Sequence, residues 1–224
     1  MRIADPVHLE LAYTRAMMAS LLFRPELPRH ALSIGLGGGS LVKFLYHRLP
    51  ACRLEVVECD PEVVAMARGY FSLPEDSGRL ATVVADGAEH LAQRHTAPVD
   101  LVLVDVYDGS RQVAGCATRA FFASAARTLT PEGVCAVNFW SNTSEFSAYR
   151  DRFLDAFSGR VLLLPAARPG NVIAFGLASA DGDWRWACLR ARAATLEHSL
   201  GLEYGAFVDG LRASNPYTEN RLLM

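Results

Sequence analysis

The sequence predicts an α/β fold with a doubly wound, mostly parallel seven-stranded sheet whose last strand is antiparallel. Short apolar segments alternate with amphipathic helical segments from residue 31 to residue 157, and this alternation is typical of a parallel sheet with right-handed crossovers. A glycine-rich turn at residues 35–39 follows the first apolar segment. The two final strand-like segments, 160–164 and 171–177, are separated by too few residues for a parallel crossover, so we expect them to pair as an antiparallel hairpin.

Length and composition favour a single domain over residues 1–224 and exclude several classes of protein. We expect an N-terminal helical segment (1–30), a nucleoside-binding α/β core (31–178) and a helical C-terminal tail (179–224). The net charge of −2 argues against nucleic-acid binding, and we expect neither a membrane span nor a signal peptide. Five widely spaced cysteines without a CxxC motif indicate reduced thiols and a cytoplasmic location. The six histidines form no ligand-spaced cluster, so we expect no metal.

The first thirty residues are predicted to form a helix that ends before the first strand. Apolar residues recur in it at helical spacing, and two prolines follow them. Tyr13 and Arg15 lie where such a helix could meet a ligand. The alternative is that these two residues are a packed aromatic ring and a solvated charge.

The candidate binding residues follow the ends of the first predicted strands. The strand at 31–34 runs into the glycine-rich turn, in which Gly35, Gly37 and Gly39 allow a sharp turn and a close approach to a ligand. In open α/β sheets the ligand lies beyond the carboxyl ends of the strands. Residues at neighbouring strand ends are therefore predicted to face a single crevice.

Each of the next three strands ends at an acidic residue, namely Glu58, Asp86 and Asp105. Glu58 stands about 20 positions after the glycine turn, where an acidic residue can accept hydrogen bonds from both hydroxyls of a ribose. The alternative for all three acids is a helix cap or a solvated loop residue.

The second half of the chain completes the sheet. The hairpin is expected to place one reversed strand at the sheet edge, which is the pattern of class I S-adenosylmethionine-dependent transferases with a methyltransferase-like Rossmann fold. A nicotinamide-binding sheet would normally stay parallel, and its third glycine would stand at Ser40. The other predicted segments are helix 118–128, a turn at 130–133, strand 134–138, and helices 144–157, 184–200 and 205–212.

Five motifs in this order resemble the spermidine synthase (polyamine aminopropyltransferase) family, over roughly residues 8 to 178. The first three resemble the nucleoside loop of that family, its ribose-binding strand and its adenine-side Asp-Gly motif. The fourth is similar to its active-site loop, which carries two aspartates three positions apart, and the fifth to the helix and strand after that loop. The motifs are LSIGLGGGSLVKFL, VVECDPEVVAMARGYF, VVADGAEHL, LVLVDVYDGS and ATRAFFASAARTLTPEGVCAVN.

The resemblance implies a transferase that binds a sulfonium nucleoside and moves an aminopropyl group to a small-molecule amine or another small acceptor. The implied donor is decarboxylated S-adenosylmethionine or S-adenosylmethionine. Asp105 would be the proton acceptor and Asp108 a second catalytic acid on a loop over the substrate. The family also favours a homodimer. The implied nucleoside contacts are Gly35, Gly37, Gly39, Glu58, Cys59, Asp86, Gly87 and Asp105, and the implied substrate contacts are Tyr13, Tyr107 and Asp108.

Three departures from the family pattern leave the reaction open. Gly38 stands where the family usually carries an aspartate, so a counter-charge for a cationic aminopropyl group is missing. The family's Asp-Ser-Ser-Asp-Pro is replaced by residues 105–109, Asp-Val-Tyr-Asp-Gly, and its Tyr-His-Glu by residues 13–15, Tyr-Thr-Arg. The alternatives are an S-adenosylmethionine-dependent methyltransferase of a small molecule and a catalytically silent nucleoside-binding module.

Overall fold

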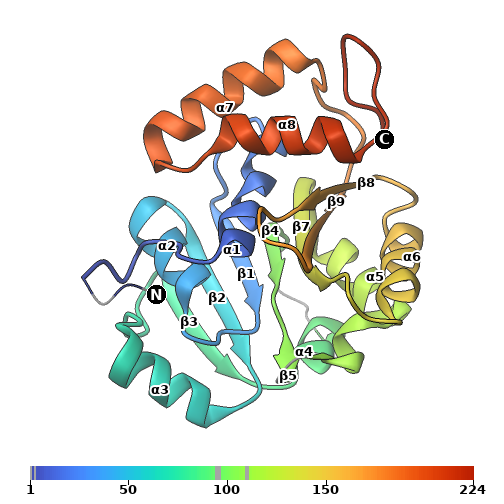
Figure 1. Ribbon diagram of the computed structural model, residues 1–224. Helices are drawn as coiled ribbons and strands as arrows, with labels where there is room; N and C mark the ends of the chain where they lie inside the picture. The colour runs from blue at the N-terminus through green and yellow to red at the C-terminus, as the bar shows by residue number, and fades with distance from the viewer. Residues whose placement is uncertain (1, 3, 94–96, 109–110) are drawn as a thin grey trace.

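A seven-stranded sheet lies at the centre of the molecule (Figure 1). The computed structural model describes residues 2, 4–93, 97–108 and 111–224. The strand order is β3-β2-β1-β4-β7-β9-β8; neighbouring strands from β3 to β7 are parallel, and β9 is antiparallel to both of its neighbours. The strands are β1 (His30–Ile34), β2 (Arg53–Glu58), β3 (Leu80–Val84), β4 (Val99–Val104), β7 (Leu129–Trp140), β8 (Val161–Pro165) and β9 (Asn171–Leu177).

The predicted fold class is confirmed, with one difference at the edge of the sheet. Strands β8 and β9 form the predicted antiparallel hairpin, with Val161 opposite Gly176 and Pro165 opposite Val172. The reversed strand is not at the edge, however, because β9 lies between β7 and β8. Residues 173–177 of β9 are all buried, whereas only alternate residues of β8 are. The more continuously apolar strand therefore takes the interior position.

Helices cover both faces of the sheet, so its central strands are buried on both sides. Leu101 and Leu103 of β4 belong to one apolar cluster, which includes residues of the N-terminal and C-terminal helices. Val102 and Val104 belong to a second cluster on the other face. The first cluster contains residues of α1 (Ala12–Met17), η1 (Met18–Phe23), α2 (Ser40–Arg48), α3 (Pro61–Phe71), α7 (Trp186–Leu200) and α8 (Tyr204–Ser214); the second contains residues of α4 (Gly87–Gln93), η2 (Ala114–Ala117), α5 (Arg119–Thr128) and α6 (Phe146–Ala156).

Strand β7 is longer than the predicted strand 134–138 and starts at Leu129. Leu129 pairs with Val99 and Val134 with Leu101, so residues 130–133 are an irregularity within the strand. The sequence Thr-Pro-Glu-Gly there was expected to be a turn, and the structure accommodates it as a bulge between two paired regions.

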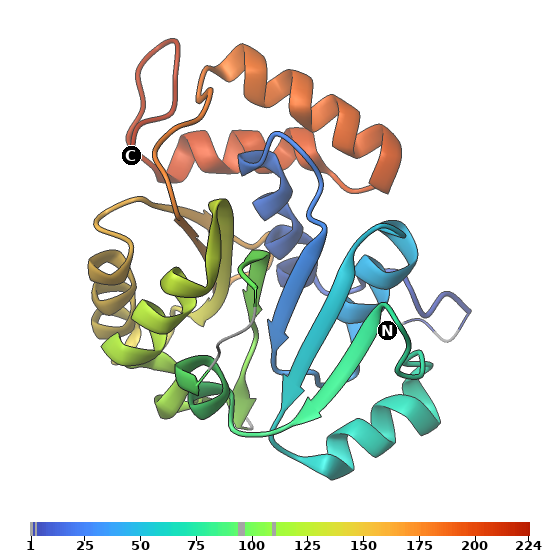
Figure 2. The ribbon, with the colours of Figure 1, turned by 180° about the vertical axis from the view of Figure 1, so that it is seen from behind.

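The N-terminal helix is shorter than predicted, and its α-helical part, α1, covers only Ala12–Met17 before the chain tightens into the 3₁₀ helix η1. The C-terminal helices α7 and α8 form a layer across one end of the sheet (Figure 1). The arrows of β1 to β4 point away from this layer in both ribbon views (Figure 2). The layer therefore lies at the amino ends of the parallel strands, and the glycine turn lies at the opposite edge.

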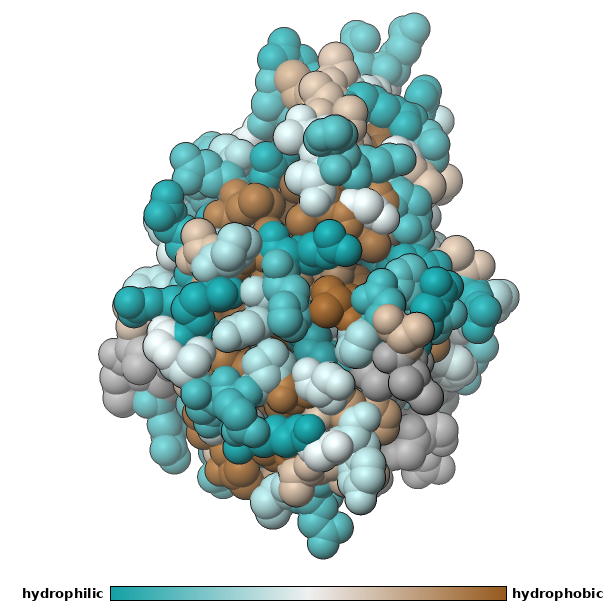
Figure 3. Space-filling view, turned by 90° about the vertical axis from the view of Figure 1, so that its left-hand side faces the viewer, coloured by the Kyte–Doolittle hydropathy of each residue, from teal (hydrophilic) through white to brown (hydrophobic). Residues whose placement is uncertain are grey.

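Hydrophobic surface is limited on the face shown in Figure 3, where hydrophilic residues separate small hydrophobic patches and the upper patches lie just below the α7–α8 layer. Within the described part of the chain, no helix combines the length and the apolar character that crossing a membrane requires.

Candidate functional site

The glycine turn bends the chain tightly against the end of β4. The Gly35 N–H donates to the Val57 carbonyl at 2.8 Å. Gly35 has a φ of +91°, and a β-carbon there would lie 2.3 Å from the Asp105 carbonyl oxygen. Gly39 caps α2 at a φ of +69°, and a β-carbon there would lie 2.9 Å from Leu73 Cδ1. Both positions therefore require glycine, for backbone conformation and for close contact.

The carboxylate of Glu58, the last residue of β2, is fixed beside this turn. Its Oε2 accepts a hydrogen bond from the Leu36 N–H at 3.0 Å, and its Oε1 accepts one from the Asp60 N–H at 3.1 Å. The exposed thiol of Cys59 lies 3.5 Å from Glu58 Oε1. Local burial and this carboxylate raise the pKa of the Cys59 thiol. The backbone bonds orient Glu58 while leaving lone pairs on both oxygens.

Asp86 has the helix-capping role that the sequence left as an alternative. Its Oδ1 accepts hydrogen bonds from the N–H groups of Ala88 (2.8 Å) and Glu89 (2.9 Å) at the start of α4. The second oxygen, Oδ2, has no hydrogen-bond partner among the described residues. Gly87 packs closely, because a β-carbon there would lie 2.5 Å from Ile34 Cγ2. Capping and ligand binding can therefore use different oxygens of the same carboxylate.

Asp105, directly after β4, is the centre of a partly buried polar network. Its Oδ1 accepts a hydrogen bond from Asn138 Nδ2 at 2.9 Å, and Tyr13 lies close enough to the carboxylate to interact with it. Asn138 in turn accepts a hydrogen bond on Oδ1 from Asn171 Nδ2 at 2.9 Å. Burial raises the pKa of Asp105, and the interactions with Asn138 and Tyr13 oppose this shift. Burial, and then the charge of Asp105, raise the pKa of Tyr13.

Tyr107 extends the same network from the segment after β4. Its hydroxyl donates to the Asn138 carbonyl oxygen at 2.8 Å, and its pKa is raised by burial and by the charge of Asp105. The backbone of β5 (Tyr107–Asp108) pairs antiparallel with β6 (Arg111–Gln112). The Asp108 side chain, predicted to be catalytic and to contact substrate, lies outside the described part of the structure.

A small cavity of about 90 Å³ joins three of the predicted features. Tyr13, the glycine turn and Asp105 all line it, and the turn contributes Gly35 and residues 36–38. Of the described residues that line this cavity, only Asp105 carries a carboxylate. Glu58 and Tyr107 are linked to the same elements by hydrogen bonds but do not line the cavity. Its other lining residues are Thr14, Ser33, Ser40, Leu41 and Val42.

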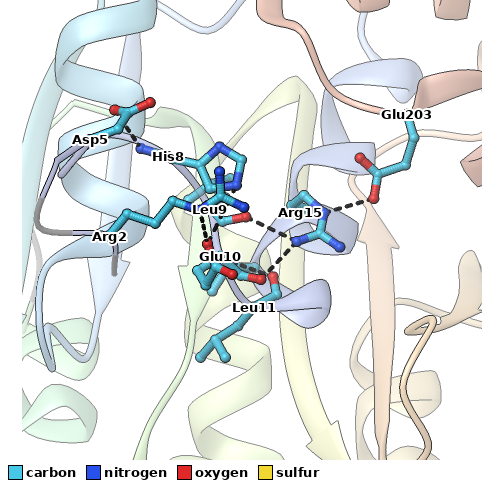
Figure 4. Close-up of polar contacts among 9 residues, drawn as sticks. Arg2, Asp5, His8, Leu9, Glu10, Leu11, Arg15 and Glu203 are labelled. Carbon is cyan, nitrogen blue, oxygen red and sulfur yellow. Dashed lines mark hydrogen bonds and ion pairs between the residues drawn. The ribbon is translucent and has the colours of Figure 1, made fainter.

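Arg15 does not share the cavity with Tyr13, although both belong to α1. Its Nε donates to Glu203 Oε1 at 2.7 Å, and its NH1 group donates to the carbonyl oxygens of Leu9 (3.0 Å) and Glu10 (2.9 Å), as Figure 4 shows. The alternative of a solvated charge is wrong for this residue. Arg15 ties the N-terminal segment to the C-terminal layer.

Two asparagines and a cysteine of this region were not predicted. Asn138 is 2% exposed and could have been found, because it ends the fifth predicted strand as the acids end the second to fourth. Asn171 gave no local signal, since its contact with Asn138 depends on the pairing of β7 with β9. Buried Cys116 lies near Asp86 and Cys59; burial, and then the charge of Asp86, raise its pKa to about 12.

Backbone donors, a strand-end carboxylate and a partly buried carboxylic acid with a raised pKa can together bind a polar ligand and exchange a proton with it. Among the residues that the structure describes, no group of three or more histidine, cysteine or acidic side chains could hold a metal ion.

The strand order with its reversed β9, together with the glycine turn, defines the class of S-adenosylmethionine-dependent methyltransferase-like folds. Solved structures share this fold. Human methyltransferase-like protein 13, in complex with SAH, has a TM-score of 0.74 at 24% identity, with 85% of this chain and 92% of that chain covered. A spermidine synthase in complex with the transition-state analogue AdoDATO has a TM-score of 0.67 at 19% identity, with 86% and 76% covered.

Sequence comparison shows the family. The model of the spermine/spermidine synthase domain matches residues 10–162. A polyamine aminopropyltransferase of Chromobacterium violaceum is 40% identical over 224 residues, which are 100% of this chain and 85% of the relative. The chain therefore belongs to the spermine/spermidine synthase family, and the resemblance found in the sequence motifs is confirmed.

Proposed function

We propose that the protein transfers an aminopropyl group from decarboxylated S-adenosylmethionine to the amine of a small acceptor. The observation that carries this proposal is the placement of Asp105. Its carboxyl group lines one cavity with Tyr13 and the glycine turn, in a chain of the spermine/spermidine synthase family.

The reaction is a displacement at the carbon next to a sulfonium. The acceptor nitrogen forms a new bond to this carbon, the carbon–sulfur bond breaks, and the sulfur keeps the electron pair as a neutral thioether. Because the nitrogen must attack as a free amine, it gives up a proton. Asp105 is the acceptor for that proton, and its burial favours the protonated product form. The hydrogen bond from Asn138 holds the carboxylate in position before the transfer.

The donor would lie across the carboxyl ends of β1 to β4. In this arrangement Gly35, Gly37 and Gly39 bring the backbone close to the donor, and Glu58 accepts hydrogen bonds from the ribose hydroxyls. Its present contacts to the glycine turn support this role, because they hold the carboxylate beside the turn. The remaining proposed contacts are Asp86, Gly87 and Cys59 around the adenine, and Tyr13, Tyr107 and Asp108 around the acceptor.

The turnover and nucleoside binding of the Asp105→Asn variant test the role of Asp105 as the proton acceptor. We expect no aminopropyl transfer, because an amide cannot accept the proton, while calorimetry should show that methylthioadenosine still binds. Glu58→Ala should have the opposite pattern and weaken nucleoside binding by about 2 kcal/mol, the contribution of one to two charge-assisted hydrogen bonds. Normal turnover by Asp105→Asn, or an unaltered dissociation constant for Glu58→Ala, would refute the corresponding assignment.

Methyl transfer from intact S-adenosylmethionine is the second candidate, and Gly38 is the observation that favours it. Without an acidic side chain at this position, Asp105 is the one carboxylate among the described residues of the cavity. A donor that keeps its own carboxylate would therefore meet less repulsion. Calorimetric titration with both donors distinguishes the two candidates: tighter binding of the decarboxylated donor supports aminopropyl transfer, tighter binding of the intact donor supports methyl transfer, and no binding of either refutes both.

Gly38→Asp gives a direct test of this charge argument. A β-carbon at Gly38 would contact only the Phe71 ring, at 3.6 Å or more, so the backbone can accept a side chain. The variant should bind the decarboxylated donor more tightly and the intact donor less tightly. Gly38→Asn is the matched control, with a side chain of the same size and no charge; equal effects of the two substitutions would exclude electrostatics as the cause.

The domain organisation, the cellular location and the oligomeric state of the enzyme are also proposals. We infer that residues 1–224 act as one unit, since α1, α7 and α8 share an apolar cluster with the sheet. All five cysteines are free, which supports a reducing cytoplasm. A homodimer stays a prediction that light scattering of the purified protein tests.

A further inference from the structure

Trp140 is an exposed aromatic residue at the carboxyl end of β7, and the proposed reaction assigns it no role. It is 38% exposed. Side chains alternate along a strand, so Trp140 lies on the same face of β7 as Asn138, two residues earlier. Asn138 donates to Asp105 Oδ1 at 2.9 Å. The indole therefore lies on the Asp105 side of the sheet, at the edge where open α/β sheets bind their ligands.

The neighbouring strand β9 places Trp140 in the same position. Asn171 stands directly opposite Trp140, and residues opposite each other in an antiparallel pair project from the same face. Asn171 Nδ2 donates to Asn138 Oδ1 at 2.9 Å, so this face also carries the network around Asp105. The register along β7 and the pairing with β9 both place the indole beside that network.

The indole ring is held in place by the turn that precedes β9. A β-carbon at Gly170 would lie 2.7 Å from Cη2 of Trp140 and 3.0 Å from Cζ2 and Cζ3, so the ring packs directly against the backbone of this turn. The Gly170 carbonyl oxygen accepts hydrogen bonds from the Ser141 N–H (2.7 Å) and the Ser141 hydroxyl (3.1 Å). These bonds tie the turn to the residue after Trp140. Part of the ring is thus fixed against the protein while the rest is open, which is a preorganised contact surface.

The strand order leaves this end of the sheet to the acceptor. The donor is proposed to lie across the ends of β1 to β4, and β7 lies on the far side of β4 from β1. Tyr107, one of the proposed acceptor contacts, donates to the Asn138 carbonyl oxygen at 2.8 Å, two residues before Trp140. Trp140 is therefore placed to contact the acceptor and not the donor.

The surroundings of the ring favour contact with an alkyl chain. The turn at residues 166–170 reads Ala-Ala-Arg-Pro-Gly and contains no acidic residue, and Asn138 and Asn171 are neutral amides. An exposed indole binds an ammonium group only weakly, whereas its large apolar surface suits methylene groups. Trp140 lies about 7 Å along β7 from Asn138, a length that an extended chain of about five carbons spans.

We propose that Trp140 determines acceptor specificity, because its indole packs against the aliphatic chain of a primary alkylamine whose nitrogen lies at Asp105. This inference rests on the proposed aminopropyl transfer and adds the class of acceptor. The acceptor is a primary amine with a chain of about four to six carbons, long enough to reach the ring.

A series of amines with lengthening chains tests this contact. Methylamine, propylamine and pentylamine are compared as acceptors for the wild type and for Trp140→Ala, with decarboxylated S-adenosylmethionine as the donor. In the wild type kcat/KM should rise from methylamine to pentylamine. Trp140→Ala should lower kcat/KM for pentylamine by about tenfold and for methylamine by less than about twofold, because only the longer chain loses apolar contact. Calorimetric titration of pentylamine into protein saturated with methylthioadenosine should show a matching loss of affinity.

Three further variants control for other effects. Tyr217→Ala removes another exposed aromatic residue, 50% exposed, from the C-terminal segment, and it should change none of these values. Trp140→Phe keeps an aromatic ring and should restore most of the preference for the longer chain. Trp140→Gln replaces the ring with a polar chain and should show the same loss as Trp140→Ala, so it provides the test if the alanine variant does not fold.

1,4-Diaminobutane separates contact with the chain from contact with a second charge. It matches pentylamine in length and carries a second amine in place of the methyl group. Trp140→Ala should lower kcat/KM for the two acceptors by similar factors. A loss confined to 1,4-diaminobutane would overturn the inference, because the ring would then bind an ammonium group.

Equal losses for all chain lengths, or an unchanged kcat/KM for pentylamine in Trp140→Ala and Trp140→Gln, would also overturn the inference. In both cases aminopropyl transfer by the wild type would leave the proposed function intact. Failure of the wild type to transfer an aminopropyl group to any of these amines would instead refute the proposed function, and this inference with it.

Discussion

Replacement of Asn138 by leucine should shift the pH dependence of turnover. Asn138 Nδ2 donates to Asp105 Oδ1 at 2.9 Å, and this bond opposes the rise in pKa that burial causes. A hydrogen bond to a charged group contributes about 1.5–3 kcal/mol, and one pKa unit corresponds to about 1.4 kcal/mol. Asn138→Leu should therefore raise the pKa of Asp105 further, by about one to two units.

The sign of the effect on activity follows from the role of Asp105 as a base. A higher pKa leaves more of the carboxyl group protonated at a given pH, so the acidic limb of the profile of kcat/KM against pH should move to higher pH by the same one to two units. Asn171→Ala is the control, since Asn171 contacts Asn138 and not Asp105. An unchanged acidic limb in Asn138→Leu would refute the conclusion that the hydrogen bond from Asn138 sets the pKa of the catalytic base. Loss of packing alone would lower the whole profile without moving it along the pH axis.

Three further predictions concern stability. Burial raises the pKa of Asp105 above its value in the unfolded chain, so the folded state disfavours the charged carboxylate and Asp105→Asn should raise the melting temperature at neutral pH. Scanning fluorimetry should show that this gain vanishes below about pH 4, where Asp105 is protonated in both the folded and the unfolded chain. In urea unfolding, Gly35→Ala should lower the free energy of unfolding by more than about 3 kcal/mol, because Gly35 has a φ of +91° and a β-carbon there would lie 2.3 Å from a backbone oxygen. Gly37→Ala, at a φ of +50° in open space, should lower it by about 1 kcal/mol, and equal losses would contradict the role of this close contact. Arg15→Gln removes an ion pair and two hydrogen bonds to the backbone and should lower the free energy of unfolding by about 1–2 kcal/mol, while Glu203→Gln should lower it by less than about 1 kcal/mol. A larger loss for Glu203→Gln would show that the ion pair, and not the backbone hydrogen bonds, fixes the N-terminal segment.

The strand ends could be predicted from the sequence because they depend on local order. An apolar run followed by a glycine turn or an acidic residue is visible within ten residues, and parallel pairing then brings those ends to one edge. Gly35, Glu58, Asp86 and Asp105 all follow this logic. For Asp86 the same local signal could not separate a helix cap from a ligand contact, and its Oδ1 serves as the cap.

Contacts between distant segments could not be predicted in the same way. Asn138 and Asn171 meet because β9 inserts between β7 and β8, and the sequence indicated the hairpin without its position in the sheet. Arg15 and Glu203 are 188 residues apart, and each looks like an ordinary surface charge on its own. Residues 130–133 carry turn-forming residue types, yet pairing on both sides overrides that local preference and keeps them within β7.

The direction of β9 determines where the C-terminal tail can act. A parallel last strand would end at the carboxyl edge of the sheet and place the following helices beside the nucleoside crevice. Because β9 is reversed, it starts at Asn171 within the Asp105 network and ends at Leu177 at the opposite edge of the sheet. The α7–α8 layer is consequently built at the amino edge of the parallel strands, away from the Asp105 network (Figures 1 and 2). The C-terminal tail therefore leaves the nucleoside crevice open.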